Sequence, residues 1–249
     1  MRQRIFHIML LLSIVSIPTF AQKNNGSGLE LGAEGEYKIS KKASVSLGTA
    51  FRTRNSFKTV DRWSFSVGGS YKILSPLKIS GGYTLLYNNN IEKINYDDYG
   101  EVKNWRPSYW GIRHRFNVSL TGILKVKRFT FSLRERWQYT YRPEKTTRRY
   151  DFRDEAWEDK TISGKGKNIL RSRLQIDYNI RKCKITPYVN AELFNSCVVE
   201  KIRVIGGANW NVTKHHQLSL YYRYQKDFEP DEDFDPNMHT LGVCYKFKF

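Results

Sequence analysis

The chain has 249 residues, a formal net charge of +18 and a mean hydropathy of −0.60. No apolar run reaches the length of a membrane-spanning helix, which excludes a protein that crosses a bilayer through several helices. A transmembrane β-barrel has an equally polar average, because alternate residues of each strand face a wet lumen.

A short apolar run at the N-terminus has the pattern of a secretory signal peptide. Arg2 and Arg4 precede the run, and Ala21 offers a small residue for cleavage. We therefore expect residues 1–21 to be removed and residues 22–249 to form one barrel in the outer membrane. Removal would lower the net charge from +18 to +16, since the segment holds two arginines and no acid. The alternative is an N-terminal membrane anchor, for which the run is short.

Apolar and polar residues then alternate with period two in eleven stretches, which predicts antiparallel strands with one apolar and one polar face. Single-chain bacterial barrels have even strand numbers, so we expect a closed antiparallel transmembrane barrel of about 10–12 strands and prefer 12. Either a short strand near residues 23–28 completes the set or one pair of stretches is wrongly divided. The predicted strands cover residues 29–39, 43–54, 63–71, 77–87, 116–122, 129–141, 170–180, 185–193, 202–210, 218–224 and 239–249.

Short turns and longer polar segments alternate along the chain, as they do between the periplasmic and outer ends of membrane barrels. Residues 88–113 and 143–167 are long and polar, and we interpret both as extracellular loops. The acidic segment 227–238 forms a third outer loop. We expect the N-terminal residues and the C-terminus to lie near the periplasm.

Aromatic residues on the apolar face sort into two levels, which predicts one girdle at each membrane interface. A soluble barrel would turn its apolar face inward and need no girdles. Glu135 also falls on the apolar face, where only a β-bulge would turn it inward. The lower girdle contains Tyr37, Tyr71, Phe129, Tyr178, Trp210 and Phe249, and the upper girdle contains Phe51, Trp63, Tyr87, Tyr139, Tyr141 and Tyr224.

The last stretch, residues 239–249, ends the chain on an aromatic residue. An exposed edge strand of this kind would aggregate in a soluble protein, so it fits the closing strand of a membrane barrel. A terminal strand that ends in Phe resembles the signal read by the outer-membrane barrel assembly machinery. That resemblance implies that the assembly machinery contacts Tyr245, Phe247 and Phe249.

Three segments, Arg171–Gln175, Pro187–Phe194 and His216–Gln225, resemble a domain-of-unknown-function family of predicted Gram-negative outer-membrane β-barrels. The resemblance covers roughly residues 29–249. It implies a barrel fold and an outer-membrane location, and it assigns no catalytic or binding residues.

The polar face of the strands is rich in arginine, and charges enclosed in a barrel must be paired or hydrated. One interpretation is a structural ion-pair network that largely fills the lumen. The other is a narrow anion-favouring pore or a pocket for a small acidic ligand, which suits the planar guanidinium group. The predicted inward cations are Arg52, Arg54, Arg62, Arg115, Arg134, Arg136, Arg171, Arg173, Arg203 and Arg223, and the predicted inward acids are Glu30, Glu34, Glu36, Asp177 and Glu192.

Two alternative functions remain open. Some lipid- or lipopolysaccharide-modifying barrels carry Ser and His near the outer rim. His114 and His239 fall near this rim here, with Ser108 or Ser196 as conceivable neighbours. No spacing fixes a Ser–His–acid triad, so the sequence assigns no catalytic residue and an enzyme is the less favoured reading. A surface binding protein acting through residues 88–113 and 143–167 is the other alternative.

Cofactors, metals and disulfides find no support in the sequence. Cys183, Cys197 and Cys244 fall in a turn, an outer loop and the last strand, which is no disulfide framework. The acidic segment lacks the spacing of a calcium loop and suits contacts with basic loops or cation-bridged lipopolysaccharide. We expect outer-membrane lipids and lipopolysaccharide as partners, expect no nucleic acid, and leave the oligomeric state open.

Overall fold

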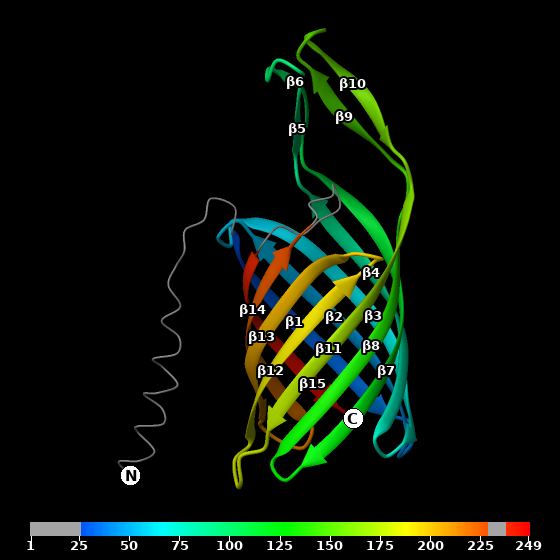
Figure 1. The fold of residues 1–249 in the computed structure, drawn as a ribbon, viewed down its shortest axis with the longest axis vertical. Helices are drawn as coiled ribbons and strands as arrows, with labels where there is room; N and C mark the ends of the chain where they lie inside the picture. The colour runs from blue at the N-terminus through cyan, green and yellow to red at the C-terminus, as the bar shows by residue number, and fades with distance from the viewer. Residues whose placement is uncertain (1–25, 229–237) are drawn as a thin grey trace, which may run out of the picture.

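The computed structural model describes residues 26–228 and 238–249, and this part of the chain is all-β. Eleven of its strands close into one barrel and four form a separate sheet (Figure 1). Among the described residues, no helix is long and apolar enough to cross a bilayer. The barrel strands are β1 (Gly26–Lys38), β2 (Ala43–Arg54), β3 (Thr59–Leu74), β4 (Leu77–Asn90), β7 (Tyr109–Val126), β8 (Phe129–Arg142), β11 (Lys165–Tyr178), β12 (Ile185–Asn195), β13 (Val199–Asn211), β14 (His216–Asp227) and β15 (Met238–Lys248).

The barrel closes through a parallel pair. Successive strands alternate in direction, so an odd number leaves the first and last strands pointing the same way. The β1–β15 ladder accordingly runs in parallel from Gly26↔Met238 to Glu36↔Lys248, and all other barrel pairs are antiparallel. The predicted closed barrel is confirmed with eleven strands, inside the expected range. The preference for twelve strands and the expectation of a wholly antiparallel sheet are both wrong.

The two ends of the barrel differ. The C-terminal residue Phe249 lies at the end with the short turns, as expected (Figure 1). The start of β1 at Gly26 lies at the opposite end, beside the β2–β3 turn, where the Ser56 N–H donates to the Ser27 carbonyl. The described N-terminal residues and the C-terminus thus lie at opposite ends of the barrel, so the expectation that both lie near the periplasm is wrong. The predicted signal segment 1–21 lies outside the described residues.

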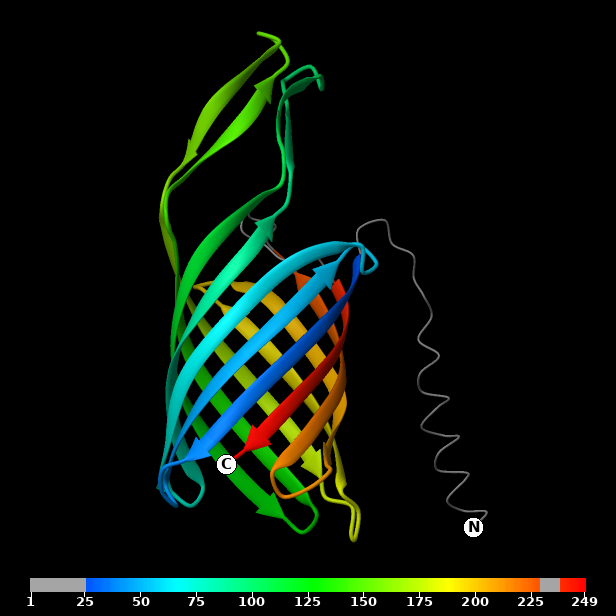
Figure 2. The same ribbon diagram turned by 180° about the vertical axis from the view of Figure 1, so that it is seen from behind.

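The segments expected to be extracellular loops are largely strands. The hairpin between β4 and β7 and the hairpin between β8 and β11 both continue beyond the barrel. Their outer strands pair in the order β10-β9-β6-β5 and form one projecting sheet, which we call the arm (Figure 2). The sequence did not indicate these strands, because a sheet whose two faces are both exposed to water can be polar on both faces. It then lacks the apolar alternation that marks a strand. The arm strands are β5 (Lys93–Tyr96), β6 (Val102–Arg106), β9 (Lys145–Asp151) and β10 (Ala156–Ile162).

The barrel carries its apolar residues on the outside. Leu174 is 51% exposed and Leu220 is 60% exposed, whereas the buried residues are mainly polar or charged. This distribution is the reverse of a soluble barrel and confirms the alternation read from the sequence. In the upper girdle, Phe51, Trp63 and Tyr87 lie opposite one another across three neighbouring strands. The fold is that of a transmembrane β-barrel.

Glu135 stays on the outer face. The β8 ladders run without a register shift on both sides, so no bulge turns this residue inward. Its carboxylate instead accepts a hydrogen bond from the Ser172 hydroxyl at 2.6 Å on the adjacent strand. A local hydrogen bond, rather than a bulge, therefore accommodates the polar group on the apolar face.

Charged residues connect β1 with β15 and, across the parallel seam, with β14. Glu30 on β1 accepts hydrogen bonds from Arg223 at 2.9 Å and from the Tyr221 hydroxyl at 2.5 Å. Further down, Lys246 of β15 contacts Glu34 at 3.0 Å and Glu36 at 2.8 Å. The acids of β1 thus meet cations of β14 and β15 inside the lumen.

Gly242 allows the Tyr221 ring to cross this seam. A Cβ at position 242 would lie 2.0 Å from Tyr221 Cζ, whereas a Cβ at Gly206 meets no atom within 4 Å.

We predict that Gly242→Ala displaces Tyr221 from Glu30 and lowers the unfolding free energy by about 1–3 kcal/mol, an overpacking cost. Urea unfolding in detergent micelles measures it. Gly206→Ala is the matched control, and equal losses for the two variants would contradict this role of the glycine.

Candidate functional site in the barrel lumen

The lumen has two unlike walls. In the lower part of the lumen, strands β2, β3 and β4 contribute small residues, whereas β8, β11 and β13 on the opposite side carry the arginines of the central region. Small residues on one side leave room for long side chains from the other, so this asymmetry decides where the lumen is filled. The small residues include Ser44, Ser46, Ser66, Gly68, Ser70, Ser80 and Gly82.

Glu192 is the centre of the arginine-rich wall. It is 2% exposed, and it contacts Arg171 at 2.5 Å and Arg134 at 3.3 Å. Strand register places Arg173 and Arg203 directly beside it on the two adjacent strands. One carboxylate therefore lies among four guanidinium groups, and the cluster carries excess positive charge.

This central cluster has hydrogen-bond donors to spare. The Nε atoms of Arg134, Arg171 and Arg173 are buried and have no hydrogen-bond partner among the described residues. A guanidinium group has five N–H donors, and buried donors without partners are costly. The cluster is thus chemically suited to an anion with several oxygen acceptors.

Above the cluster lies an upper cavity of about 330 Å³. Its lining holds eleven Lys and Arg residues but only two glutamates, Glu30 and Glu200. The lining of the upper cavity therefore has a clear excess of positive charge, and like charges concentrated in an enclosed space attract counter-ions. The basic residues are Arg52, Arg62, Arg113, Arg115, Arg142, Lys165, Lys167, Arg171, Lys201, Arg203 and Arg223.

The chain matches a family described as "Protein of unknown function (DUF2490)" over residues 31–235. It belongs to this family. The resemblance read from the sequence is therefore confirmed, and the DUF2490 barrel has the fold that the resemblance implied.

The barrel is also similar to the crystal structure of the beta domain of the Bordetella autotransporter BrkA. The TM-score is 0.50 at 11% sequence identity, with 84% of this chain and 82% of that chain covered. At this identity the likeness concerns the fold alone. No curated protein matches the DUF2490 chain.

The arginines predicted to face the lumen of the DUF2490 barrel do so. Arg115 donates to Thr140 at 3.3 Å, Arg136 to Ser119 at 2.8 Å, and Arg203 to Gln225 at 2.7 Å. Of the predicted acids, Asp177 lies lower on β11 and accepts from Gln175 at 2.9 Å, away from the central cluster.

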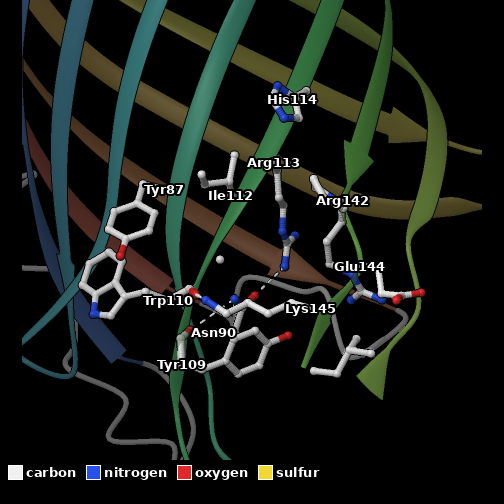
Figure 3. A pocket seen from close by; sticks show the side chains of 13 residues that line it. Tyr87, Asn90, Tyr109, Trp110, Ile112, Arg113, His114, Arg142, Glu144 and Lys145 are labelled. Carbon is white, nitrogen blue, oxygen red and sulfur yellow. Dashed lines mark hydrogen bonds between the residues drawn. The ribbon is translucent and has the colours of Figure 1, made fainter. Parts of the chain in front are cut away.

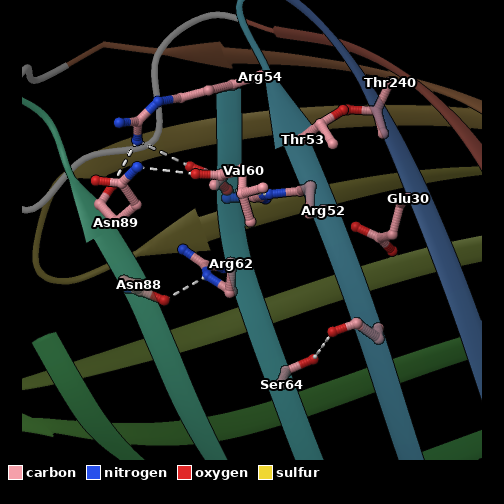
Figure 4. Close-up of polar contacts among 12 residues, drawn as sticks. Glu30, Arg52, Thr53, Arg54, Val60, Arg62, Ser64, Asn88, Asn89 and Thr240 are labelled. Atoms are coloured by element: carbon pink, nitrogen blue, oxygen red, sulfur yellow. Dashed lines mark hydrogen bonds and ion pairs between the residues drawn. The ribbon is translucent and has the colours of Figure 1, made fainter. Parts of the chain in front are cut away.

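Asp61 joins two of the predicted arginines at the upper rim. It contacts Arg52 at 2.5 Å and Arg54 at 3.1 Å. In Figure 4 Arg54 also reaches Asn89, whose carbonyl it contacts at 2.5 Å, and Arg62 reaches Asn88. These contacts make the rim a hydrogen-bonded network.

Sequence alternation missed Asp61 and a second inward acid, Glu200, for the same reason. In each case the strand register shifts by one residue, at Arg52/Thr53 and at Phe194/Asn195, and the acid is the extra residue of the bulge. Glu200 consequently turns inward and contacts Lys167 at 2.8 Å. A bulge re-aims a side chain without leaving a sequence pattern, so neither acid was predictable from parity.

A lower cavity of about 400 Å³ lies towards the short turns. Its charged lining is nearly balanced, with Glu34 and Glu36 against Lys78, Arg136 and Lys246. The excess of positive charge therefore lies in the upper part of the lumen and in the central cluster.

The residues weighed for catalysis do not come together. The His114 ring contacts the Tyr83 hydroxyl at 2.7 Å, and the His239 ring contacts the Tyr222 hydroxyl at 2.5 Å. Ser196 donates to Glu200 instead of meeting a histidine.

Of the acidic segment 227–238, Asp227 pairs with Lys201 at 3.1 Å, and residues 229–237 lie outside the described residues.

The cysteines lie where the sequence placed them. Cys183 is in a short turn, Cys197 is in the β12–β13 connection and Cys244 is on β15, and all three are free thiols.

Removing the central carboxylate tests how strongly it holds the cluster. We predict that Glu192→Gln lowers the unfolding free energy by about 3–5 kcal/mol, because it leaves Arg134 and Arg171 buried without a counter-charge. The measurement is gel electrophoresis of unheated samples, in which the band of the folded barrel disappears as the urea concentration rises. Glu34→Gln is the control, since Glu36 still pairs with Lys246 there. A Glu192 variant as stable as the control would show that the pairs contribute little.

Proposed function

We propose that this protein is an integral outer-membrane barrel whose cationic, largely filled lumen binds small anions and passes them through a narrow pathway. The observation that carries the proposal is the charge of the upper cavity, eleven basic residues against two acids. Carboxylates and phosphates match the planar donor geometry of arginine and are the anions that this site suits best.

Three features support the outer-membrane location. The outer face is apolar, aromatic girdles flank it, and the N-terminal segment has the pattern of a signal peptide. Outer-membrane lipids and lipopolysaccharide are then the surroundings of the barrel. The barrel assembly machinery would engage β15 through Tyr245, Phe247 and Phe249, of which Tyr245 and Phe249 are exposed.

Planar-bilayer recordings test the proposed function. We predict anion-selective conductance, and a fall in anion preference when Arg134 and Arg171 are both changed to Gln, because two cations leave the central cluster around Glu192. The control is the double change Lys41→Gln and Lys42→Gln, which removes the same charge from a short turn outside the lumen. Unchanged ion selectivity in the arginine variant, with only a loss of stability, would mean that the network is purely structural.

The arm supports a second candidate function, binding at the cell surface. Ile94, Trp105, Tyr150 and Trp157 lie opposite one another across all four arm strands and so share one face. Trp157 is 45% exposed and its ring lies 5.4 Å from that of Tyr150. A row of rigid aromatic groups is a common basis for binding surfaces.

Hydrogen bonds hold the arm in shape behind this row. Asp97 accepts from the N–H groups of Tyr99 and Glu101, both at 3.0 Å, and contacts Arg153 of the other hairpin at 3.3 Å. Desolvation alone would raise the pKa of Asp97, but these hydrogen bonds lower it below its usual value. The two arm hairpins are therefore linked at their tips as well as through the β6–β9 ladder.

The saccharide part of lipopolysaccharide is the ligand with which we test the arm. We predict that Trp157→Ala weakens binding of soluble core oligosaccharide by about tenfold or more, as expected for an exposed aromatic anchor. Isothermal titration of the purified barrel measures it, with Phe57→Ala, an exposed aromatic on the β2–β3 turn, as the control. Equal affinities of the two variants would exclude the aromatic row as the binding surface.

A further inference from the structure

The barrel wall is split near its outer rim. The β7–β8 ladder ends at His114↔Tyr141, and the same two hairpins pair again only at Trp105↔Tyr150 in the arm. Between these points, residues 106–113 and 142–149 face each other without a ladder. The upper part of β7 therefore has a free edge, although a barrel wall normally pairs every strand on both sides.

A cavity of about 370 Å³ occupies this split (Figure 3). Strand alternation turns Trp110 and Ile112 outward and turns Tyr109 and Arg113 inward, and all four line the cavity. The cavity thus extends around the edge of β7 from the outer face to the lumen. Arg113 and Arg142 belong both to its lining and to that of the upper cavity, so the two spaces adjoin.

A side-chain contact crosses the split where the ladder is missing. Lys145 donates to the Trp110 carbonyl from the other hairpin. Asn90 of β4, on the paired side of β7, donates to the Tyr109 carbonyl at 3.2 Å and accepts from Arg113 at 2.7 Å. Figure 3 shows the Arg113 side chain reaching towards Asn90. Side-chain contacts hold an opening less tightly than a continuous ladder does.

The lining combines two chemistries. Its outer part is aromatic and apolar, with the Tyr87 and Trp110 rings stacked at a centroid distance of 4.7 Å. Tyr87 is also in line with Phe51 and Trp63 of the upper girdle, so this part lies at the level of the membrane interface. The charged part carries Arg113, Arg142 and Lys145 against the single acid Glu144.

We propose that this split is a lateral window that binds an amphiphile with a phosphate-bearing head group, taken from the outer leaflet. The apolar chain packs against Tyr87, Trp110 and Ile112 on the outside. The phosphate meets Arg113 and Arg142, beyond which the cationic upper cavity continues. The proposal shares these two arginines with the proposed anion site, but it does not require that the lumen conduct ions.

Fluorescence quenching tests the window with the full chain in phosphatidylcholine vesicles. The probes are phosphatidylglycerol and phosphatidylcholine, each brominated on the acyl chain, and the Trp110 signal is the difference between the wild type and Trp110→Phe. We predict that brominated phosphatidylglycerol quenches Trp110 at a lower mole fraction than brominated phosphatidylcholine. Trp63, isolated in the same way with Trp63→Phe, lies at the same level on β3 and should respond to both lipids alike.

The cations are tested by the double variant Arg113→Gln and Arg142→Gln. The loss of two charge-assisted contacts should raise the half-quenching fraction of phosphatidylglycerol by about tenfold or more. Lys145→Gln is a second variant at an exposed position, and it should shift the response in the same direction. The unchanged Trp63 signal verifies that each variant is folded and inserted.

Two quenching results would overturn the proposal. One is a Trp110 response no more selective than that of Trp63. The other is a selectivity that survives in both cation variants. Inorganic phosphate added to the vesicles distinguishes the ligand source: the lipid preference should persist in its presence, and displacement by phosphate at the concentration of the lipid would refute the amphiphile.

Discussion

A strand that separates hydrocarbon from an enclosed lumen must satisfy its backbone hydrogen bonds with neighbouring strands, and the structure depends on this constraint. Eleven strands meet it only if the first and the last pair in parallel. The contact of Glu34 with Lys246 then connects the two strands of that seam, and the contact of Glu30 with Arg223 reaches across it to β14. Where the β7–β8 ladder stops, Lys145 of the other hairpin donates to the Trp110 carbonyl of β7.

The same enclosure gives the lumen its chemistry. Inward charges cannot be screened as they are in bulk water, so each needs a counter-charge, a hydrogen bond or a bound ion. Glu192 is the counter-charge of both Arg134 and Arg171. At the rim, the bulge acids Asp61 and Glu200 form ion pairs with neighbouring cations. The cations still outnumber the acids in the upper cavity. The structural network and the proposed anion site therefore follow from one arrangement, in which the paired residues hold the excess charge in place.

Sequence alternation predicted the barrel, its apolar exterior and the inward arginines, because a period of two fixes the side of each residue once a strand is regular. It failed where the strand is not regular: Asp61 and Glu200 turn inward at bulges. It also could not show the parallel seam, which follows from the strand count rather than from local pattern. The arm was mistaken for loops, since its polar strands have only a short aromatic row, exemplified by Trp105 and Tyr150. The lateral window arises where two neighbouring strands do not pair, and no pattern in the sequence predicts such a gap.

Spin labels placed singly at residues 170–177 of β11 test the central claim most directly. The collision rate of each label with oxygen, which concentrates in hydrocarbon, and with a water-soluble nickel chelate would be measured in lipid vesicles. The account predicts a strict alternation, with labels at Leu170, Leu174 and Ile176 meeting oxygen and labels at Arg171, Arg173 and Gln175 shielded from it. A flat profile, or one with the two sets exchanged, would contradict the account.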